Sequence, residues 1–355
     1  MRYMKAVAFS TLFLFVFNQS RAQFSDARWT KEQANTWYAN YPWLRGCNFI
    51  PSTAVNQLEM WQAETFDSAT IETELQLAEE TGFNCMRVFL HHVAWQVDTA
   101  GFKSRVNTYL NIAHKHGMVT MFVFFDDCWN AAYQSGRQPE PKPGIHNSQW
   151  VRDPGKLIYE QRDSLYPVLE SYVKDMLTSF SSDKRILMWD LYNEPGNSGN
   201  GPRTLPLLKK VFKWAREVNP HQPVTAGVFL KLFGRLSNFQ LRNSDVVTYH
   251  CYFGPRQHLA RVKQLKRFGR PLICTEYMAR TMNSTFQNIM LMLKEQGVGA
   301  INWGLVSGKT NTIYAWLTPM PDGREPKLWF HDIFRKDGAA YKEEEVKFIK
   351  SLTGK

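Results

Sequence analysis

Short apolar stretches alternate with amphipathic segments along almost the whole of this chain. The apolar stretches are rich in β-branched and aromatic residues and end at turn-forming residues, which predicts buried strands. These predicted strands are residues 44–50, 85–90, 119–125, 186–192, 224–229, 246–251, 272–276 and 300–305. Segments with helical periodicity lie between them, at 68–81, 103–116, 163–180, 204–218, 256–268 and 285–295, with a doubtful helix near 236–241 and a closing helix at 342–352.

Strands that alternate with helices form parallel sheets, and eight is the number of strands that closes into a barrel. Glycines just past three predicted helices, Gly82, Gly117 and Gly297, agree with helix ends at these points. An open doubly wound sheet is the alternative, but no glycine-rich phosphate loop follows the first strand. We therefore predict the α/β class and a single (β/α)8 TIM barrel.

The connections that follow the carboxyl ends of the predicted strands are much longer than those that precede the strands. The longest follow the first, third and eighth strands, at 51–67, 126–162 and 306–336. Long loops inside a compact domain usually carry function. Trp129 in the second of these loops could stack on a sugar ring, or could simply pack within its own loop.

The amino terminus has the pattern of a secretory signal peptide. A basic start precedes an apolar segment at 6–17, and a polar stretch with a small-residue cleavage candidate near Ala22 follows it. A buried amino-terminal helix is the alternative. We predict a signal peptide at 1–22, a catalytic domain at 23–355, and a secreted or periplasmic protein with no membrane span in the mature chain.

Charge and cysteine content narrow the classes of partner. The formal net charge is +11, but lysine and arginine are spread along the chain and do not form a block interleaved with aromatic residues. Nucleic acid is therefore not expected as a partner, while a preference for an acidic polysaccharide stays open. The five cysteines are odd in number and lack zinc-ligand spacing. No disulfide framework is indicated, although one pair could still bridge.

Two glutamates close predicted strands that are far apart in sequence. Glu194 stands in the turn Asn193-Glu194-Pro195-Gly196 after the fourth strand, and Glu276 ends the seventh strand in the segment LICTEY. Each could be a solvated loop residue. In a parallel barrel, however, the active site lies at the carboxyl ends of the strands. Two carboxylates that face each other are the smallest set of catalytic groups that can cleave a glycosidic bond.

An ordered set of strand-end residues resembles clan A retaining glycoside hydrolases, most nearly the cellulase-like family 5. The resemblance spans about residues 44–305. It rests on Arg87 in CMRVFLH, on Asn193-Glu194-Pro195, on His250 and Tyr252 in TYHCY, on Glu276 in ICTEY and on Trp303 in INWG. Each match is weak alone, but every one of them falls at the strand end where the family has it.

The resemblance implies a role for each of the two glutamates and for their neighbours. Glu194 would be the acid/base and Glu276 the nucleophile, while Asn193 would bind the sugar 2-hydroxyl. Arg87 and Tyr252 would keep the nucleophile ionised and oriented.

Two further residues have implied roles, and structural alternatives remain open. His250 would contact the acid/base or the sugar, and Trp303 would floor the subsite next to the cleaved bond. Arg87 could instead be a buried ion-pair partner. His250 could be a histidine of the core, and Trp303 could simply fill the core. Acid, nucleophile and water suffice for the reaction, so no metal and no cofactor are expected.

The end of the third strand departs from the family pattern. Family 5 enzymes commonly have a histidine there, whereas this chain has Asp126 and Asp127. These carboxylates could bind sugar hydroxyls, or they could cap the loop. His91-His92, after the second strand, could supply a similar polar contact. The stretch 316–345 has no counterpart in the ordinary cellulase pattern.

Taken together, these features predict an exported retaining β-glycosidase that hydrolyses β-linked polysaccharide or oligosaccharide, of the endo-glucanase, xylanase or mannanase type. One alternative is an exo-acting enzyme resembling β-mannosidases or β-galactosidases. Another is a non-catalytic carbohydrate-binding barrel. A cytosolic barrel enzyme with a phosphate site is disfavoured, because no glycine-rich cradle follows the last two strands. Carbohydrate is the one partner predicted, and the sequence makes no prediction of the oligomeric state.

Overall fold

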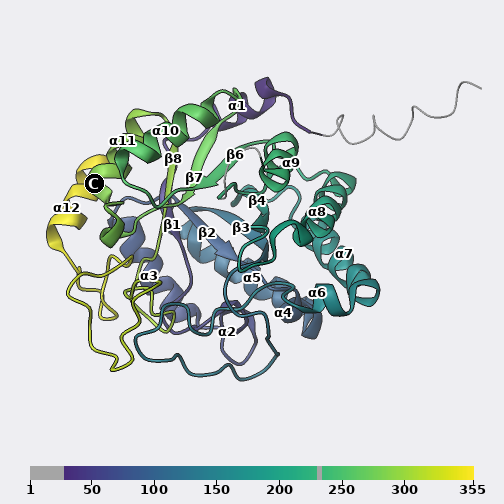
Figure 1. Ribbon diagram of the computed structural model, residues 1–355, viewed down its shortest axis with the longest axis horizontal. Helices are drawn as coiled ribbons and strands as arrows, with labels where there is room; N and C mark the ends of the chain where they lie inside the picture. Colours follow the sequence, from purple (N-terminus) through teal and green to yellow (C-terminus); the bar gives the residue numbers. More distant parts are fainter. Residues whose placement is uncertain (1–27, 230–233) are drawn as a thin grey trace, which may run out of the picture.

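Eight parallel strands form one sheet in the computed structural model, which describes residues 28–229 and 234–355. The strand order is β5-β4-β3-β2-β1-β8-β7-β6, and every pairing is parallel. The strands are β1 Arg45–Asn48, β2 Cys85–Phe89, β3 Val119–Asp126, β4 Ile186–Asn193, β5 Val224–Thr225, β6 Val247–His250, β7 Leu272–Glu276 and β8 Gly299–Trp303. Figure 1 shows these strands at the centre of the molecule with the helices around them.

The sheet closes between its two end strands, so the predicted (β/α)8 barrel is confirmed. Val228 forms a parallel bridge with Tyr249. The backbone N–H of Val228 donates to the carbonyl of Thr248 at 2.9 Å, and that of His250 donates to the carbonyl of Val228 at 3.0 Å. β5 itself is shorter than the predicted strand 224–229, because beyond Thr225 the chain pairs with β6 through this single bridge.

Helices follow the strands in the predicted order. They are α1 Lys31–Ala39, α2 Gln57–Trp61, α3 Ser68–Glu80, α4 His92–Val97, α5 Thr99–Lys115, α6 Leu157–Glu160, α7 Arg162–Ser179, α8 Leu205–Val218, α9 Arg235–Asn243, α10 Pro255–Lys266, α11 Leu291–Glu295 and α12 Glu343–Thr353. The doubtful helix after the fifth strand is present as α9. The helix predicted at 285–295 begins with a π-helical turn, Phe286–Met290, before it continues as α11.

The amino-terminal segment covers the bottom of the barrel with its aromatic side chains. Trp37, Tyr38 and Tyr41 pack against a buried cluster in the barrel interior that includes Leu44 and Met121. The signal peptide predicted at 1–22 lies outside the described residues.

Within the two described ranges, no helix is long and apolar enough to cross a bilayer. All five cysteines are free, so the disulfide that the sequence left open does not form. Four of them are buried, as expected for cysteines inside strands: Cys47, Cys85, Cys251 and Cys274.

The loops after the third and eighth strands are hydrogen-bonded to each other. The backbone N–H of Met320 donates to the carbonyl of Gly144 at 2.9 Å, and that of Asn147 donates to the carbonyl of Thr310 at 2.8 Å. Gly144 has φ +66°, and a Cβ there would lie 1.6 Å from the carbonyl oxygen of Met320, so this close approach requires glycine. We call these joined segments, residues 126–156 and 306–342, the wall (lower part of Figure 1).

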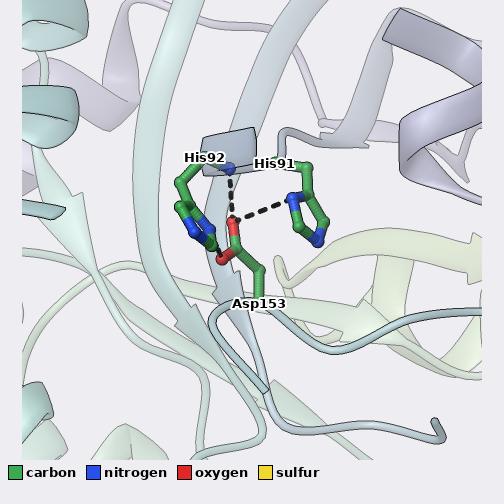
Figure 2. Close-up of side chains that lie close together, drawn as sticks. All are labelled: His91, His92 and Asp153. Atoms are coloured by element: carbon green, nitrogen blue, oxygen red, sulfur yellow. Dashed lines mark hydrogen bonds and ion pairs between the residues drawn. The ribbon is translucent and has the colours of Figure 1, made fainter. Parts of the chain in front are cut away.

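A buried cluster fixes the third loop to the end of β2. Asp153 accepts the backbone N–H of His92 at 2.7 Å and pairs with the His92 ring. Its other close neighbour is the His91 ring, 3.9 Å away (Figure 2). Burial alone would raise the pKa of Asp153, but His91 and His92 outweigh that effect, so the pKa is lowered and the carboxylate stays charged. The two histidines therefore position the loop rather than reach the pocket.

Replacing Asp153 with alanine is expected to reduce the free energy of unfolding by about 3 kcal/mol, because the His92 donors lose a buried charged acceptor. Urea denaturation measures this change. Asp322→Ala is the control, since Asp322 is exposed and its ion pair with Arg324 is long, which predicts a loss below about 1 kcal/mol. Equal losses in the two variants would contradict the assigned role of the cluster.

Candidate active site

The two predicted glutamates meet at the mouth of the barrel. Glu194 directly follows β4, and Glu276 is the last residue of β7. One carboxylate oxygen of each and one ring nitrogen of His250 all lie within 4.8 Å of one another. Glu194 has φ +44°, a left-handed conformation that is costly for a residue with a side chain and is found most often at functional sites. The turn after β4 thus aims Glu194 across the barrel at Glu276.

Glu276 is surrounded by groups that stabilise its charged form. Nη1 of Arg87 donates to its Oε1 at 2.9 Å, and the hydroxyl of Tyr252 donates to its Oε2 at 2.8 Å. The ring of His250 lies 3.4 Å from the same Oε2. A direct cation and a hydroxyl donor both favour the ionised carboxylate.

Glu194 has neutral partners instead. Its Oε1 shares a hydrogen bond of 2.7 Å with Nδ1 of His250. Its Oε2 accepts from the thiol of Cys128 at 3.4 Å and from the side-chain amide of Asn197. No lysine or arginine among the described residues forms an ion pair with it.

Burial and these contacts determine which of the two carboxyls, Glu194 or Glu276, carries a proton. Burial raises the pKa of Glu194, and it raises the pKa of Glu276 as well. Only Glu276 has the direct contact with Arg87, so a proton shared between the two carboxyls resides on Glu194. Burial also lowers the pKa of His250 to about 4, which leaves this ring neutral near pH 7.

Arg87 is fully buried beneath the pocket and ties several strands together. It donates to Asp190 at 2.7 Å, to Asn48 at 2.8 Å and to the side-chain oxygen of Asn193 at 2.7 Å. It is therefore both a buried ion-pair partner and the cation that holds Glu276. The amide N–H₂ of Asn193 donates to Asp126 at 2.8 Å and to the thiol sulfur of Cys128 at 3.4 Å, and Asn193 and Cys128 both line the pocket.

The structure corrects the assignment of Asp126 and Asp127 to sugar binding. Asp126 accepts from Asn193 at 2.8 Å and from the indole of Trp150 at 2.7 Å. Asp127 accepts from Tyr192 at 3.0 Å and from the backbone N–H of Gly196 at 2.7 Å. Neither lines the pocket. Their oxygens are occupied by protein donors, so these carboxylates hold the loops that present the acid/base candidate, as the alternative reading expected.

The site lies in a cavity of about 400 Å³, a size typical of small-ligand pockets. Seven of the predicted residues line it: Trp129, Asn193, Glu194, His250, Tyr252, Glu276 and Trp303. Trp150 and Trp316, aromatic residues of the long third and eighth loops, line it as well. So do ten residues for which the sequence predicted no role: Cys128, His146, Asn147, Asn197, Ser198, Phe229, Cys251, Phe253, Met282 and His331. The signal for both tryptophans was the length of their loops, and Trp316 also lies in the stretch without a counterpart in the cellulase pattern.

The two sides of the pocket differ. The wall closes one side with rings, where Trp129 packs on His146 at 5.3 Å and Trp316 packs on Tyr252 at 4.8 Å. On the other side, next to β5, β6 and β7, the described lining residues include Phe253, which is 54% exposed, and Met282. The pocket is therefore blocked by the wall and opens on the side of Phe253.

Two groups of described residues bring three potential metal ligands within 4.8 Å of one another: His91, His92 and Asp153, and Glu194, His250 and Glu276. In the first group, His91 already accepts the N–H of Val93 at 3.2 Å, and Asp153 is bonded to His92. In the second group, each carboxylate is bonded to protein donors. One ring nitrogen in these groups, Nε2 of the buried His250, has no hydrogen-bond partner among the described residues.

Comparison with known proteins agrees with this geometry. The family model described as cellulase (glycosyl hydrolase family 5) matches residues 45–232. Comparison with the sequences of curated proteins gave no match.

Similar solved structures share the fold at low sequence identity. An exo-β-1,4-mannosidase from Opitutaceae bacterium strain TAV5 has a TM-score of 0.62 and 19% identity, and the match covers 88% of this chain and 60% of that one. An endo-β-1,4-mannanase from Thermotoga petrophila has a TM-score of 0.57 and 14% identity, covering 88% and 76%. A family 5 mannosidase from Rhizomucor miehei has a TM-score of 0.55 and 13% identity, covering 88% and 92%. This chain thus spans less than two thirds of the first of these structures.

Proposed function

This chain belongs to glycosyl hydrolase family 5, and from that premise we propose that it is an exo-acting retaining β-glycosidase that removes a neutral terminal sugar. The observation that carries the proposal is the pair Glu194 and Glu276, with oxygens within 4.8 Å of each other in a pocket that the wall closes on one side. Retaining enzymes have carboxyl groups about 5–5.5 Å apart, whereas inverting enzymes need about 6.5–9.5 Å to admit a water.

In the first step, Glu276 attacks the anomeric carbon and Glu194 gives its proton to the leaving oxygen. The glycosidic bond breaks, and a covalent glycosyl ester forms on Glu276. Arg87 and Tyr252 keep the attacking carboxylate ionised until this moment. In the substrate complex, the amide of Asn193 would donate to the sugar 2-hydroxyl in place of the Cys128 sulfur, a contact that strengthens in the transition state.

In the second step, Glu194 is a carboxylate and takes a proton from water as that water attacks the anomeric carbon. The ester bond to Glu276 breaks, and the sugar leaves with its original configuration. His250 bonds to Glu194 at 2.7 Å and lies 3.4 Å from Glu276. The neutral ring therefore holds the two carboxyl groups in a fixed relative position. Trp303 floors the subsite, packed against Trp150 at 5.5 Å.

The position of the wall at one side of the pocket supports exo action. The acid Glu194 must face the leaving group. It follows β4, whose neighbour β5 borders the side that opens to solvent. The leaving group therefore lies toward Phe253, and the retained sugar lies toward the wall. A chain that continued beyond the retained sugar would collide with the wall, which favours exo cleavage over the endo cleavage that the cellulase pattern predicts.

Charge and structural similarity support a neutral sugar, with a β-mannoside as the first candidate. No lysine or arginine lies among the described residues that line the pocket, so the net positive charge of the chain is not directed at the substrate. An acidic polysaccharide is therefore not favoured. Three similar structures are a mannanase and two mannosidases by name.

Product analysis tests this proposal. The enzyme is incubated with aryl β-mannoside, β-glucoside and β-galactoside, and with reducing-end-labelled β-linked oligosaccharides of mannose and glucose. We expect one aryl glycoside to be cleaved, and the labelled chains to shorten by one sugar at a time. Internal fragments as the first products would indicate an endo enzyme instead, and absence of any cleavage with sugar binding retained would indicate a binding barrel.

The sequence pattern of the amino terminus supports export as part of the proposal. Amino-terminal sequencing of the protein from its native host is expected to begin near Gln23. A mature protein that begins at Met1 would contradict export.

Removing the amide of Asn197 is expected to move the basic limb of the pH profile of kcat/KM to higher pH. The Asn197 amide donates to Glu194 and stabilises its charged form, which lowers the pKa of this carboxyl. Without that donor the pKa rises, and Glu194 keeps the proton that the first step requires up to a higher pH.

The measurement compares Asn197→Ala with Ser198→Ala, whose hydroxyl accepts from the backbone N–H of Trp129 and does not contact Glu194. The control should leave the basic limb in place. An unchanged or lowered basic limb in Asn197→Ala would show that Glu194 is not the acid.

A further inference from the structure

We infer that His146 and His331 form a pair of hydrogen-bond acceptors that binds hydroxyl groups of the terminal sugar and selects a neutral, unsubstituted ring. This inference rests on the proposed exo-glycosidase function and names the residues that choose its sugar. Both histidines come from the wall, and neither belongs to the set of strand-end residues that carries the family resemblance.

Backbone carbonyls fix the tautomer of both rings. Nδ1 of His146 donates to the carbonyl oxygen of Tyr314 at 2.8 Å. Nδ1 of His331 donates to the carbonyl oxygen of Met278. A carbonyl oxygen accepts hydrogen bonds and cannot donate them, so in a neutral ring Nδ1 carries the hydrogen and Nε2 is left as an acceptor. The fold therefore presents two acceptors of defined orientation.

The acceptor of His331 has no partner in the part of the chain that the structure describes. The His331 side chain is fully buried, and its Nε2 makes no hydrogen bond to any described residue, although the ring lines the pocket. Buried polar atoms in proteins are almost always paired, so an unpaired one at a pocket calls for a ligand donor. A sugar hydroxyl can supply that donor.

Aromatic packing connects the pair to the catalytic residues. The rings of His146 and His331 lie 5.3 Å apart, so one sugar ring can reach both. His331 also packs on Tyr252 at 5.6 Å, and the Tyr252 hydroxyl holds Glu276. The pair therefore faces the sugar that is attached to Glu276 during the reaction, on the side away from the leaving group.

Burial keeps both rings in the accepting form. It lowers the pKa of His146 to about 4 and lowers the pKa of His331 well below its ordinary value. Neutral acceptors bind hydroxyl donors, but they repel the carboxylate of a uronic acid and gain nothing from an acetyl ester. The pair thus selects against charged and esterified terminal rings.

The test pairs each histidine variant with deoxy substrates. The unmodified enzyme, His146→Phe and His331→Phe are assayed with nitrophenyl β-mannoside, β-glucoside and β-galactoside, and with the monodeoxy analogues of whichever is cleaved. A site built to bond a hydroxyl rejects the analogue that lacks it, so removing one hydroxyl should lower kcat/KM of the unmodified enzyme by at least about 100-fold.

In the variant that lacks the matching acceptor, kcat/KM on the parent glycoside should fall by about 10- to 100-fold, while the value for the deoxy analogue stays nearly unchanged. The discrimination between the two substrates then collapses. This loss of discrimination separates a contact from a structural role, because a variant that only disturbs folding lowers both values equally. If His331→Phe does not fold, His146→Phe carries the test alone.

His258→Phe is the matched control. His258 is a buried histidine on α10 that bonds to the Tyr249 hydroxyl and lies outside the pocket lining. Its replacement should leave the ratio of kcat/KM for the parent glycoside to kcat/KM for each deoxy analogue unchanged. If His146→Phe and His331→Phe both cleave the parent glycoside and keep the same ratios as the unmodified enzyme, the inference is overturned and the proposed function stands. Failure of the unmodified enzyme to cleave any of the three glycosides would overturn the proposed function, and the inference with it.

Discussion

Replacing Glu276 with glutamine is expected to reduce turnover by at least about 10⁴-fold, for activated and natural substrates alike, because the covalent step loses its nucleophile. The amide keeps the size of the side chain and can still bond to Arg87 and Tyr252. The fold and the shape of the pocket should therefore remain, and binding of the sugar should persist. Stopped assays with an aryl β-glycoside and its natural oligosaccharide measure the loss.

Glu74→Gln is a matched control for this substitution. Glu74 is another buried glutamate, and it accepts the backbone N–H of Ser52; neither residue lines the pocket. Burial raises the pKa of Glu74 to about 7, so its carboxyl is already partly neutral near pH 7 and the amide is a mild change. Full turnover should persist in this variant. If Glu276→Gln turned over substrate at the wild-type rate, Glu276 could not be the nucleophile.

The second large effect is expected at Glu194, where glutamine should lower kcat/KM by about 10²- to 10⁴-fold on substrates whose leaving oxygen needs a proton. Substrates with very good leaving groups need no proton, so they should form the glycosyl ester at nearly the normal rate. Its hydrolysis then becomes slow, because no base activates water. A burst of the aryl alcohol followed by a slow steady state is the expected time course.

Azide gives this substitution a second readout. A small anion can attack the glycosyl ester without a general base, so azide should restore turnover of the activated substrate by Glu194→Gln and yield a β-glycosyl azide. The same treatment of Glu276→Gln should yield no β-product, because no ester forms on that residue. Equal losses for good and poor leaving groups in Glu194→Gln would contradict its role as the acid.

The alternation of elements and the ends of strands were predictable from sequence. Each apolar run is short and is closed by a turn signal, so the position of Glu276 at the end of β7 could be read directly. Glu194 was predictable for the same reason, although its left-handed backbone was not. The carboxyl ends of the strands lie at the mouth of the barrel, which is why the two glutamates could be located from one sequence.

The direction of side chains just past a strand was not predictable. Asp126 and Asp127 follow an apolar run as the two glutamates do, yet they turn away from the pocket toward Trp150 and Tyr192. Trp129, two residues further on, has φ +69° and lines the pocket instead. Backbone turns of this kind are set by contacts with distant loops, and a local pattern does not contain those contacts.

The length of the third and eighth loops suggested that they could build a wall, but the sequence could not show that they do. The two segments of the wall are more than 100 residues apart in the chain, and their pairing depends on backbone hydrogen bonds and on the absence of a Cβ at Gly144. Neither leaves a periodic signal in the sequence. In the proposed function the wall favours exo over endo cleavage and supplies His146 and His331, so substrate choice could be proposed only once these loops were seen together.

The most direct test of the account is to trap the covalent intermediate. An activated 2-fluoro β-glycoside of the preferred sugar slows both steps but leaves the first one faster, so the ester accumulates. Intact mass spectrometry should show one fluorosugar per chain, and peptide mapping should place it on Glu276. Turnover of the ordinary glycoside with release of the inverted anomer, and no labelled enzyme, would contradict the account.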